Sequence, residues 1–575
     1  MKRIIKSIVI SASLIISFTA CEDFLNETPK GSVFEEQLET PENIEKLVIT
    51  TYSALGNEHF QQPLSPWPYG NLRAGDAYKG GAGTGDMGDF HLFETFVYMR
   101  DNVGMLDRRW YQGYKAISRA NTALEKLNAI SSAELPTRDL RIAEVRFLRA
   151  HFYFDLKILF KHIPYVDETI PVEEYKNISN RELTDQQGWE YIIQEFRYAA
   201  DNLGDPTGEI GRINKWMAKA YLAKALLYAA YEQDEKNDVI NIDKGKLEEV
   251  VSLTDEIIAS GRYNLAANFE ENFLWETQNG KESIFAIQYS VNDGTMFGRL
   301  DFGAMLNYPM NAEYGCCGFH SPSQNLVNAF KTDHNGLPLF DSFNTTSIST
   351  AADLQNNNID PRLLHSVAIP EMPYKYKPDF IFKESWTRQP ETYGAFMSLK
   401  EVELPDCPCF KKLLPFMSSA KNRDIIRFDD MLLWRAEALI ELDRQSEALP
   451  IINSIRKRAA QSTTRLVDIE GKKTGKFVVE EYKPGVNIPA WDKTFATKAL
   501  RWERRLEMAL EGYRFFDLVR WGIAAETVNE YFAVEKTRRQ YLNEAKFEKN
   551  RDEYFPIPKS QIDFSKKLYQ QNYGW

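Results

Sequence analysis

Residues 500–522 read LRWERRLEMALEGYRFFDLVRWG, and this segment sets the strongest limit on how the chain can fold. Apolar residues recur at helical spacing through Leu506, Ala509, Leu510 and Tyr513, which predicts one amphipathic helix with a buried face. The other positions mix arginines and carboxylates with tryptophans and phenylalanines, whereas an ordinary surface helix keeps its charges away from its aromatic residues. We therefore expect guanidinium–carboxylate pairs, three or four residues apart and partly buried.

A catalytic interpretation of the same carboxylates exists. Two carboxylates one helical turn apart would lie about 5–6 Å from each other, close to the separation in retaining glycosidases. The neighbouring arginines would keep both groups ionised, whereas a general acid must be protonated. Structural ion networks also produce such clusters. We therefore interpret the charges as structural, and the sequence contains neither the H-E-x-x-H nor the G-x-S-x-G pattern of hydrolytic enzymes. The chain is not expected to be an enzyme.

The N-terminus has the pattern of an export signal. Lys2, Arg3 and Lys6 surround the start of an apolar segment, residues 4–18, that is too short to span a membrane as a mature helix. Small residues then precede Cys21. This pattern predicts a lipoprotein signal peptide over 1–20, a lipid on the Cys21 thiol and a tether over 21–40, with an ordinary secretory peptide as the alternative.

The remaining cysteines form two close pairs, Cys316-Cys317 and Cys407-Pro-Cys409. An even number of cysteines in an exported protein suggests disulfides. Either Cys316 bonds to Cys317 as a vicinal disulfide, or each of them bonds to Cys407 or Cys409. Neither pair has the C-x₂₋₄-C spacing of zinc sites, and no calcium-loop pattern occurs. No metal or cofactor is therefore predicted.

Helical periodicity is strongest over about 109–260 and 430–522, where alanine-rich helices follow one another in pairs. Such pairs are typical of degenerate tetratricopeptide repeats, and generic helix packing is the alternative. A loop-rich insertion over about 264–422 separates them and contains a strand-like run at 283–289. No linker is visible, so one all-α domain over 41–575 is expected. The net charge of -12 disfavours nucleic acid as a partner.

Several blocks of the sequence, in this order, resemble the SusD/RagB family of cell-surface lipoproteins of Bacteroidetes. The acidic Glu22-Asp23 after Cys21 is similar to their export tag. The other blocks are RIAEVRFLRA at 141–150, Ile163-Pro164, Asp360-Pro-Arg362, WRAEA at 434–438, INSIRKRA at 452–459, residues 500–522, FPIP at 555–558 and QNYG at 571–574.

The resemblance implies an all-helical core of four tetratricopeptide-like helix pairs, with the loop-rich insertion forming the ligand face. It also implies a partner, a SusC-like TonB-dependent outer-membrane transporter on which the lipoprotein sits as a lid. The protein would be lipid-anchored at the outer membrane and would face the exterior. An oligosaccharide or polysaccharide is the expected ligand, and a peptide, as for RagB-like members, is the alternative.

The glycine-rich segment 67–80 is the first candidate for ligand binding. A saccharide needs apolar ring faces for stacking and polar groups for its hydroxyls. Trp67, Tyr69 and Tyr78 would supply the faces, and Asn71, Arg73 and Asp76 the polar groups. The alternative is that the aromatic residues pack inward beneath the loop.

Two further segments contain the same kinds of residue. In Tyr314-Gly-Cys-Cys-Gly-Phe319, a vicinal Cys316–Cys317 disulfide would offer a flat sulfur surface to the ligand, flanked by Tyr314 and Phe319. The third segment contributes Trp386, Arg388 and Tyr393, and its arginine would lie flat on a sugar ring while donating to hydroxyls.

Overall fold

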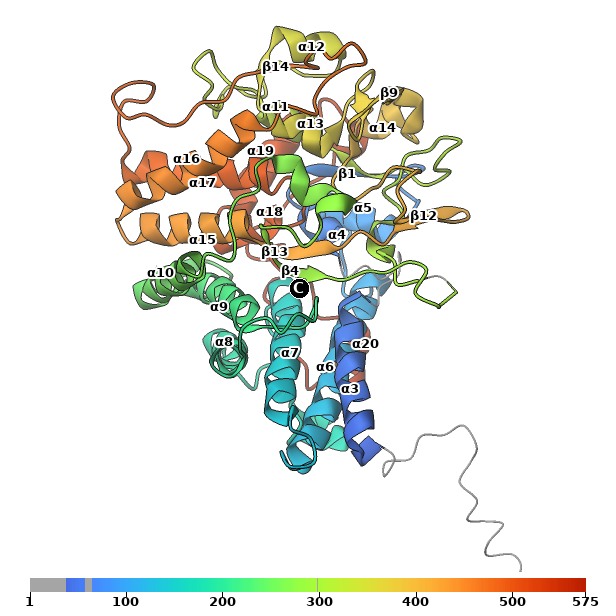
Figure 1. The fold of residues 1–575 in the computed structure, drawn as a ribbon, viewed down its shortest axis with the longest axis vertical. Helices are drawn as coiled ribbons and strands as arrows, with labels where there is room; N and C mark the ends of the chain where they lie inside the picture. Colours follow the sequence, from blue (N-terminus) through green and yellow to red (C-terminus); the bar gives the residue numbers. More distant parts are fainter. Residues whose placement is uncertain (1–37, 57–64, 297) are drawn as a thin grey trace, which may run out of the picture.

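The computed structural model describes residues 38–56, 65–296 and 298–575. The predicted signal peptide over 1–20, the lipidated Cys21 and the tether as far as residue 37 lie outside these residues. Within them, no helix is both long enough and apolar enough to cross a membrane. Figure 1 shows a row of helices in the lower part of the molecule and a loop-rich region in the upper part.

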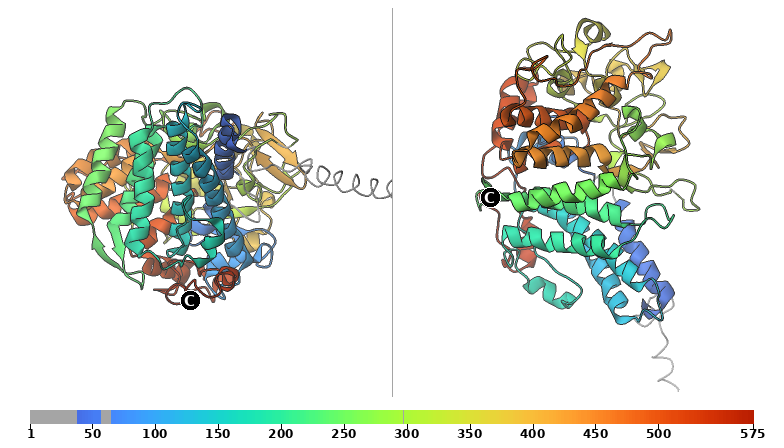
Figure 2. Two further views of the ribbon diagram at one scale, coloured as in Figure 1. Left: turned by 90° about the horizontal axis from the view of Figure 1, so that it is seen from below. Right: turned by 60° about the vertical axis from the view of Figure 1, so that its left-hand side comes forward.

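The helices of the two predicted regions form one continuous layer. Each helix from α6 to α10 packs against the next, and α10 then packs against α15, so the two regions meet although the insertion separates them in sequence. Figure 2 shows several of these helices side by side. They are α6 (Gly104–Ala129), α7 (Arg138–Phe160), α8 (Asp185–Asn202), α9 (Lys215–Ala230), α10 (Lys244–Ala259), α15 (Phe428–Glu441), α16 (Gln445–Gln461) and α17 (Lys493–Glu507).

Helix α9 is buried along nearly its whole length because α8, α10, α15 and β4 pack around it. Its alanines include Ala218, Ala223 and Ala230, which are fully buried. Small side chains at a contact allow helix axes to approach closely. At the edge of the layer, α3 (Pro41–Ser53) packs on α6 and α7, and the Thr40 side chain caps it by accepting a hydrogen bond from the Asn43 N–H.

Residues 500–522 form two helices rather than the single helix predicted. Helix α17 ends at a turn in which Leu510 and Gly512 have left-handed backbone conformations, with φ of 66° and 88°, and α18 (Arg514–Arg520) follows. Gly512 lies so close to Pro66 and Gly70 that a Cβ atom on Gly512 would collide with Pro66. Glycine tolerates both this conformation and this contact. Helical periodicity reports neither constraint.

The insertion begins and ends on one small sheet. Strand β4 (Ser283–Ile287), which agrees with the strand predicted at 283–289, pairs antiparallel with β13 (Arg423–Arg427), and α15 follows directly. Because β4 also contacts α9, both ends of the insertion are anchored on the helical layer. Its other helices and strands are β5 (Phe319–Pro322), α11 (Gln324–Ala329), α12 (Ala351–Asn356), β6 (Asn358–Ile359), α13 (Arg362–Ser366), β7 (Val367–Ala368), β8 (Pro373–Tyr374), β9 (Lys377–Ile381), α14 (Pro390–Tyr393), β10 (Met397–Ser398), β11 (Phe410–Leu413) and β12 (Phe416–Ser419).

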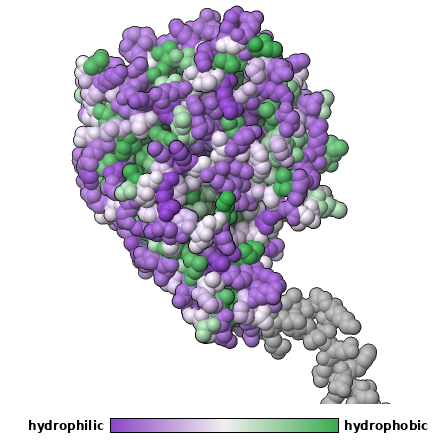
Figure 3. Space-filling model, in the orientation of Figure 1, coloured by the Kyte–Doolittle hydropathy of each residue, from purple (hydrophilic) through white to green (hydrophobic). Residues whose placement is uncertain are grey.

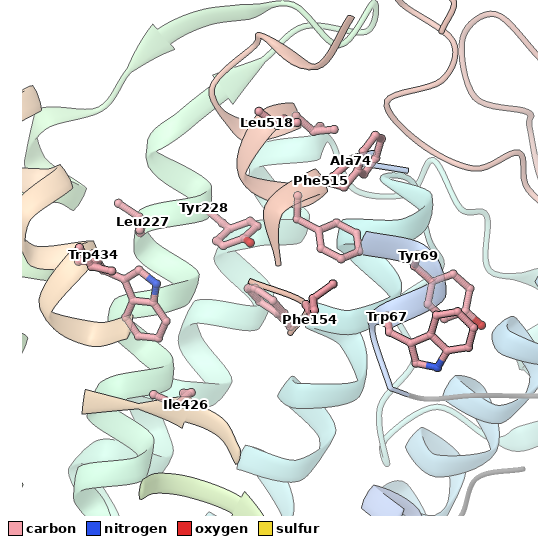
Figure 4. Close-up of a cluster of buried hydrophobic side chains, with 14 of the residues drawn as sticks. Trp67, Tyr69, Ala74, Phe154, Leu227, Tyr228, Ile426, Trp434, Phe515 and Leu518 are labelled. Atoms are coloured by element: carbon pink, nitrogen blue, oxygen red, sulfur yellow. The ribbon is translucent and has the colours of Figure 1, made fainter. Parts of the chain in front are cut away.

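Residues 65–95, which precede the helical layer in sequence, pack against both α18 and the insertion. Strand β1 pairs antiparallel with β5, with Tyr78 opposite Ser321. Figure 4 shows Trp67 and Tyr69 in the same apolar cluster as Phe515. The face of the molecule drawn in Figure 3 is, by contrast, mostly hydrophilic. The elements of this region are α4 (Trp67–Gly70), β1 (Ala77–Gly80) and α5 (Gly88–Thr95); elsewhere lie β2 (Tyr231–Gln233), β3 (Val239–Ile242), β14 (Lys476–Phe477), α19 (Ala524–Glu535) and α20 (Lys559–Phe564).

Candidate functional site

The three segments that the sequence marks as ligand candidates meet in space. Besides the pairing of β1 with β5, the Gly81 N–H donates a hydrogen bond to the Gly318 carbonyl at 2.9 Å. Arg388 Nη1 lies 2.9 Å from Asp86 Oδ2, and this ion pair joins the third segment to the loop that follows β1. The structure therefore brings the three segments together, although most of their predicted side chains point inward.

The aromatic side chains of the first segment are core residues. Trp67, Tyr69 and Tyr78 are at most 2% exposed. The Trp67 indole N–H donates to the Gly303 carbonyl at 3.0 Å, and the Tyr78 hydroxyl donates to Glu535 Oε1 at 2.9 Å. The prediction that these rings face a ligand does not fit this structure, and the inward-packing alternative does.

The polar residues of the same segment also bind partners inside the protein. Asn71 Oδ1 accepts a hydrogen bond from the Gly512 N–H at 2.9 Å and so stabilises the turn between α17 and α18. Asp76 forms a buried ion pair with Arg505, with 2.7 Å between Oδ1 and Nη2. Arg73 donates to the Asp552 carbonyl, and its guanidinium is sandwiched between the rings of Phe515 and Phe555, 4.0 and 3.9 Å from their centroids. A buried charge without such partners would be costly, so these groups are held by the core rather than offered to a ligand.

Four more predicted residues are also buried. The Tyr314 hydroxyl donates to the Glu403 carbonyl at 2.9 Å. Trp386 packs against Phe380, with ring centroids 4.8 Å apart. These buried side chains can contribute to a ligand site only by supporting the backbone above them. The four are Tyr314, Phe319, Trp386 and Tyr393, each at most 8% exposed.

The cysteines are joined as Cys316–Cys317 and Cys407–Cys409, which is the vicinal arrangement of the two considered above. Cys317 is buried, whereas Cys316 is half-buried and the neighbouring Gly315 is exposed. Among the described residues, the one cluster with metal-ligand geometry is Glu403 with Cys407 and Cys409, and both of its sulfurs belong to the second disulfide.

One outer surface remains over the buried segments, and we call it the disulfide surface. A Cβ atom added to Gly83 would lie 3.5 Å from Gln389 Oε1, so this glycine lies beside the Gln389 amide. A Cβ atom added to Gly315 would lie 3.7 Å from the Pro415 carbonyl oxygen. Leu414 is 80% exposed at the tip of the β11–β12 hairpin. The disulfide surface consists of Ala82–Asp86, Gly315–Cys316, Arg388–Gln389 and Leu414–Pro415.

The disulfide surface combines apolar faces with hydrogen-bonding groups. Cys316 and Leu414 supply the apolar part, and Arg388, Asp86 and Gln389 supply a guanidinium, a carboxylate and an amide. A sugar ring needs both kinds of group. Sequence reasoning missed Asp86, Gln389 and Leu414. The strand-like runs FKKL and FMSS around Leu414-Pro415 would have indicated a hairpin with an apolar tip.

Lys79 holds the loop of this surface in place from below. Its ammonium donates to the carbonyls of Gly80, Gly83 and Asp86, at 2.9 Å, 2.8 Å and 2.5 Å. Burial lowers the pKa of Lys79 to about 8, against the opposing effect of Glu94 and Asp86. These three hydrogen bonds connect the glycine-rich loop to one buried ammonium.

The charges of residues 500–522 form a buried ion network. Arg362 lies 2.6 Å from Glu503 Oε1 and 2.7 Å from Glu507 Oε2, and Arg458 also pairs with Glu507. All of these side chains are at most 4% exposed. The prediction of buried pairing is correct, but most partners come from distant segments; within the stretch, Arg520–Asp517 is the pair three residues apart.

Glu437 gives the network a measurable acid dependence. It is bonded to Arg520 and accepts from the Tyr231 hydroxyl at 2.7 Å and the Trp521 N–H at 2.9 Å. Burial raises its pKa, but Arg520 and the other donors outweigh burial and bring the pKa to about 2.

Because the folded pKa of Glu437 lies below its unfolded value, this group stabilises the fold above about pH 4.5, and the contribution is lost as pH falls toward 2. We expect Glu437→Gln to flatten the loss of unfolding free energy between pH 5 and 3 by about 2 kcal/mol. Urea titrations at several pH values measure this slope, with the exposed Glu391→Gln as control. An unchanged slope in Glu437→Gln would contradict the assignment.

Comparison with family models matches residues 281–575 to a model described as SusD family and residues 23–227 to one described as starch-binding associating with outer membrane. Among curated proteins, SusD-like protein P25 of Formosa agariphila is 21% identical over 552 residues, which is 92% of each chain. SusD-like protein P38 of the same organism is 25% identical over 569 residues, covering 95% of this chain and 99% of the relative.

Solved structures share the fold over nearly the whole chain. A SusD homologue from Bacteroides thetaiotaomicron superposes with a TM-score of 0.71 at 19% identity, covering 94% of this chain and 99% of the other. Surface glycan-binding protein A from the same organism, in complex with laminarihexaose, superposes with a TM-score of 0.64 at 20% identity, covering 93% and 99%. At these identities the structural likeness concerns the helical fold.

Proposed function

Since this chain belongs to the SusD family, we propose that it is a cell-surface glycan-binding lipoprotein that delivers its ligand to a SusC-like TonB-dependent transporter as that transporter's lid. The lipid on Cys21 would anchor it at the outer membrane, facing the exterior. Residues 41–575 would act as one domain, and the helix pairs of the layer would be tetratricopeptide-like units that face the transporter. The role is binding rather than catalysis.

The observation that carries the proposal is the disulfide surface. It lies where three distant segments meet, and it offers Cys316 and Leu414 as apolar faces beside Arg388, Asp86 and Gln389 as hydrogen-bonding groups. In the layer beneath, the aromatic rings are packed against one another and the buried ions are paired. We propose Cys316 and Arg388, from the residues expected at the outset, together with Gln389 and Leu414, as the ligand contacts.

The chemistry of the acidic network supports binding over catalysis. The carboxylates of Glu503 and Glu507 are bonded to arginines and fully buried, so neither reaches a ligand at the surface. Arginine partners keep carboxylates ionised, and the pKa of Glu507 lies well below its usual value because Arg458 and Arg362 outweigh the opposing effect of burial.

We test the proposal with laminarin and starch, the glycans that the comparisons suggest. Arg388→Ala is expected to weaken binding about tenfold or more, because a hydrogen bond from a charged donor contributes about 1.5–3 kcal/mol. Native affinity electrophoresis and calorimetry measure the change. Arg444→Ala, which removes an arginine that pairs with Glu447 away from this surface, is the matched control.

Two outcomes would count against the proposal in different ways. Equal binding by Arg388→Ala and the control would move the site away from the disulfide surface. A native protein that binds neither laminarin, starch nor a wider panel of glycans, but retains peptides, would replace the glycan by a peptide ligand.

A further inference from the structure

A concave surface lies beside α5 and the segment 540–545, and we call it the Tyr98 groove. Its lining includes Tyr98, Tyr541, His91, Gln540, Asn543 and Glu544. None of these residues was singled out in the sequence, and none belongs to the disulfide surface.

Tyr98 is presented to solvent in an unusual way. Its side chain is 69% exposed, although tyrosine is a large aromatic residue. Its backbone has φ of 60°, in the left-handed region that bulky residues rarely adopt, and Phe96 two residues earlier has φ of 63°. Phe96 is buried, so packing accounts for its conformation, whereas no packing of the Tyr98 ring does. A strained residue held at the surface is a reason to look for a ligand.

The polar groups around Tyr98 are available for hydrogen bonding. Within the described residues, the side chains of Gln540, Asn543 and Glu544 are exposed and make no hydrogen bond or ion pair. His91 Nδ1 is buried and has no hydrogen-bond partner in the same part of the chain. Burial and the charge of Lys79 lower the pKa of His91 to about 4, so the imidazole is neutral at neutral pH.

The residues at the bottom of the groove contact the residues that lie beneath the disulfide surface. The Tyr541 ring packs against Tyr393 with centroids 5.1 Å apart, and its hydroxyl donates to Glu94 at 2.5 Å. Tyr393 in turn lies under Lys79, 5.3 Å from the ammonium to the ring centroid. The groove and the disulfide surface are therefore carried by the same buried residues.

We propose that the Tyr98 groove is a second saccharide-binding site, which takes an uncharged sugar ring of the glycan bound by the protein. The ring would stack its C–H face on Tyr98, and its hydroxyls would bond to Gln540, Asn543 and Glu544. The carboxylate of Glu544 disfavours sulfated or uronic sugars, which carry the same sign of charge. This inference rests on the proposed glycan-binding function.

The test compares Tyr98→Ala with Tyr111→Ala, which removes a similarly exposed tyrosine, 57% exposed, from the surface of α6. The probes are laminarin and starch in native affinity gels and laminarihexaose in calorimetry. For whichever of these glycans the native protein binds, we expect Tyr98→Ala to weaken retention about fivefold while its circular dichroism stays unchanged. Tyr111→Ala is expected to behave as the native protein does. Gln540→Ala is a second variant, with an effect in the same direction.

Three results separate the two proposals. In the first result, the native protein binds, Arg388→Ala does not, and Tyr98→Ala and Gln540→Ala are retained as strongly as Tyr111→Ala. This result overturns the groove and leaves the proposed function standing. Loss in Tyr98→Ala with normal binding by Arg388→Ala supports the groove and removes the disulfide surface. A native protein retained by none of the probes overturns both for these glycans.

Discussion

Replacing Arg458 with methionine is expected to lower the free energy of unfolding by about 3–5 kcal/mol. Arg458 is 4% exposed, bonded to Glu282 and Glu507, and lies 3.4 Å from Asp429. Methionine fills a similar volume but leaves three carboxylates without this cation in a place that water does not reach. Urea unfolding followed by circular dichroism measures the loss.

The control for Arg458→Met is Arg444→Met, an arginine at the surface of the same helical layer. Its side chain is 36% exposed and pairs with Glu447 and Glu248, and exposed pairs contribute about 0–1 kcal/mol. Equal unfolding midpoints for the two variants would mean that the buried network tolerates the loss of one charge.

Replacing Trp67 with alanine is expected to cost about 3–5 kcal/mol of stability. The side chain is 1% exposed, stacks on His320 with ring centroids 4.9 Å apart and donates its N–H to the Gly303 carbonyl. The substitution leaves a cavity between α4 and β5 and an unpaired carbonyl. Thermal or urea unfolding measures the cost, and the folded fraction is expected to keep its affinity for the ligand.

Two comparisons make the Trp67→Ala result interpretable. Trp67→Phe keeps most of the volume and removes the N–H donor, so a smaller loss of about 1–3 kcal/mol is expected. Trp216→Ala removes a half-buried indole that bonds to the exposed Asp205, and its effect is expected to be smaller than that of Trp67→Ala. Abolished ligand binding with native stability in Trp67→Ala would restore this residue to the binding surface and contradict its place in the core.

Helix positions were predictable because they depend on local spacing. The periodicity expected over about 109–260 and 430–522 corresponds to the helices α6 to α10 and α15 to α18. The break at Gly512 was not predictable, because it depends on contact with Pro66 and Gly70, which lie far away in the sequence. Periodicity describes one element at a time and contains no information about its neighbours.

The candidate site was predictable only as a set of segments. Glycines and aromatic residues marked 67–80, 314–319 and 386–393 as ligand candidates, and the structure brings these segments together. Their residue types did not show direction, because Trp67 and Tyr78 are buried whereas Leu414 is exposed. The glycines of the first segment allow close packing rather than ligand access: a Cβ on Gly80 would collide with the Gly318 carbonyl oxygen. Residue type shows what a side chain can bind, and the direction in which it points depends on the strand pairing beneath it.

By itself, the sequence indicated the family, the helical periodicity and a charged segment whose groups had to be paired, while the export signal stays a prediction. The tertiary structure decided which partners those charges take, where α17 ends, and which loop residues reach the solvent. The physical reason is range. Helical spacing and signal peptides are local properties of the chain, whereas burial, ion pairing and the disulfide surface arise from contacts such as Arg362–Glu503 and Arg388–Asp86, between residues that only folding brings together.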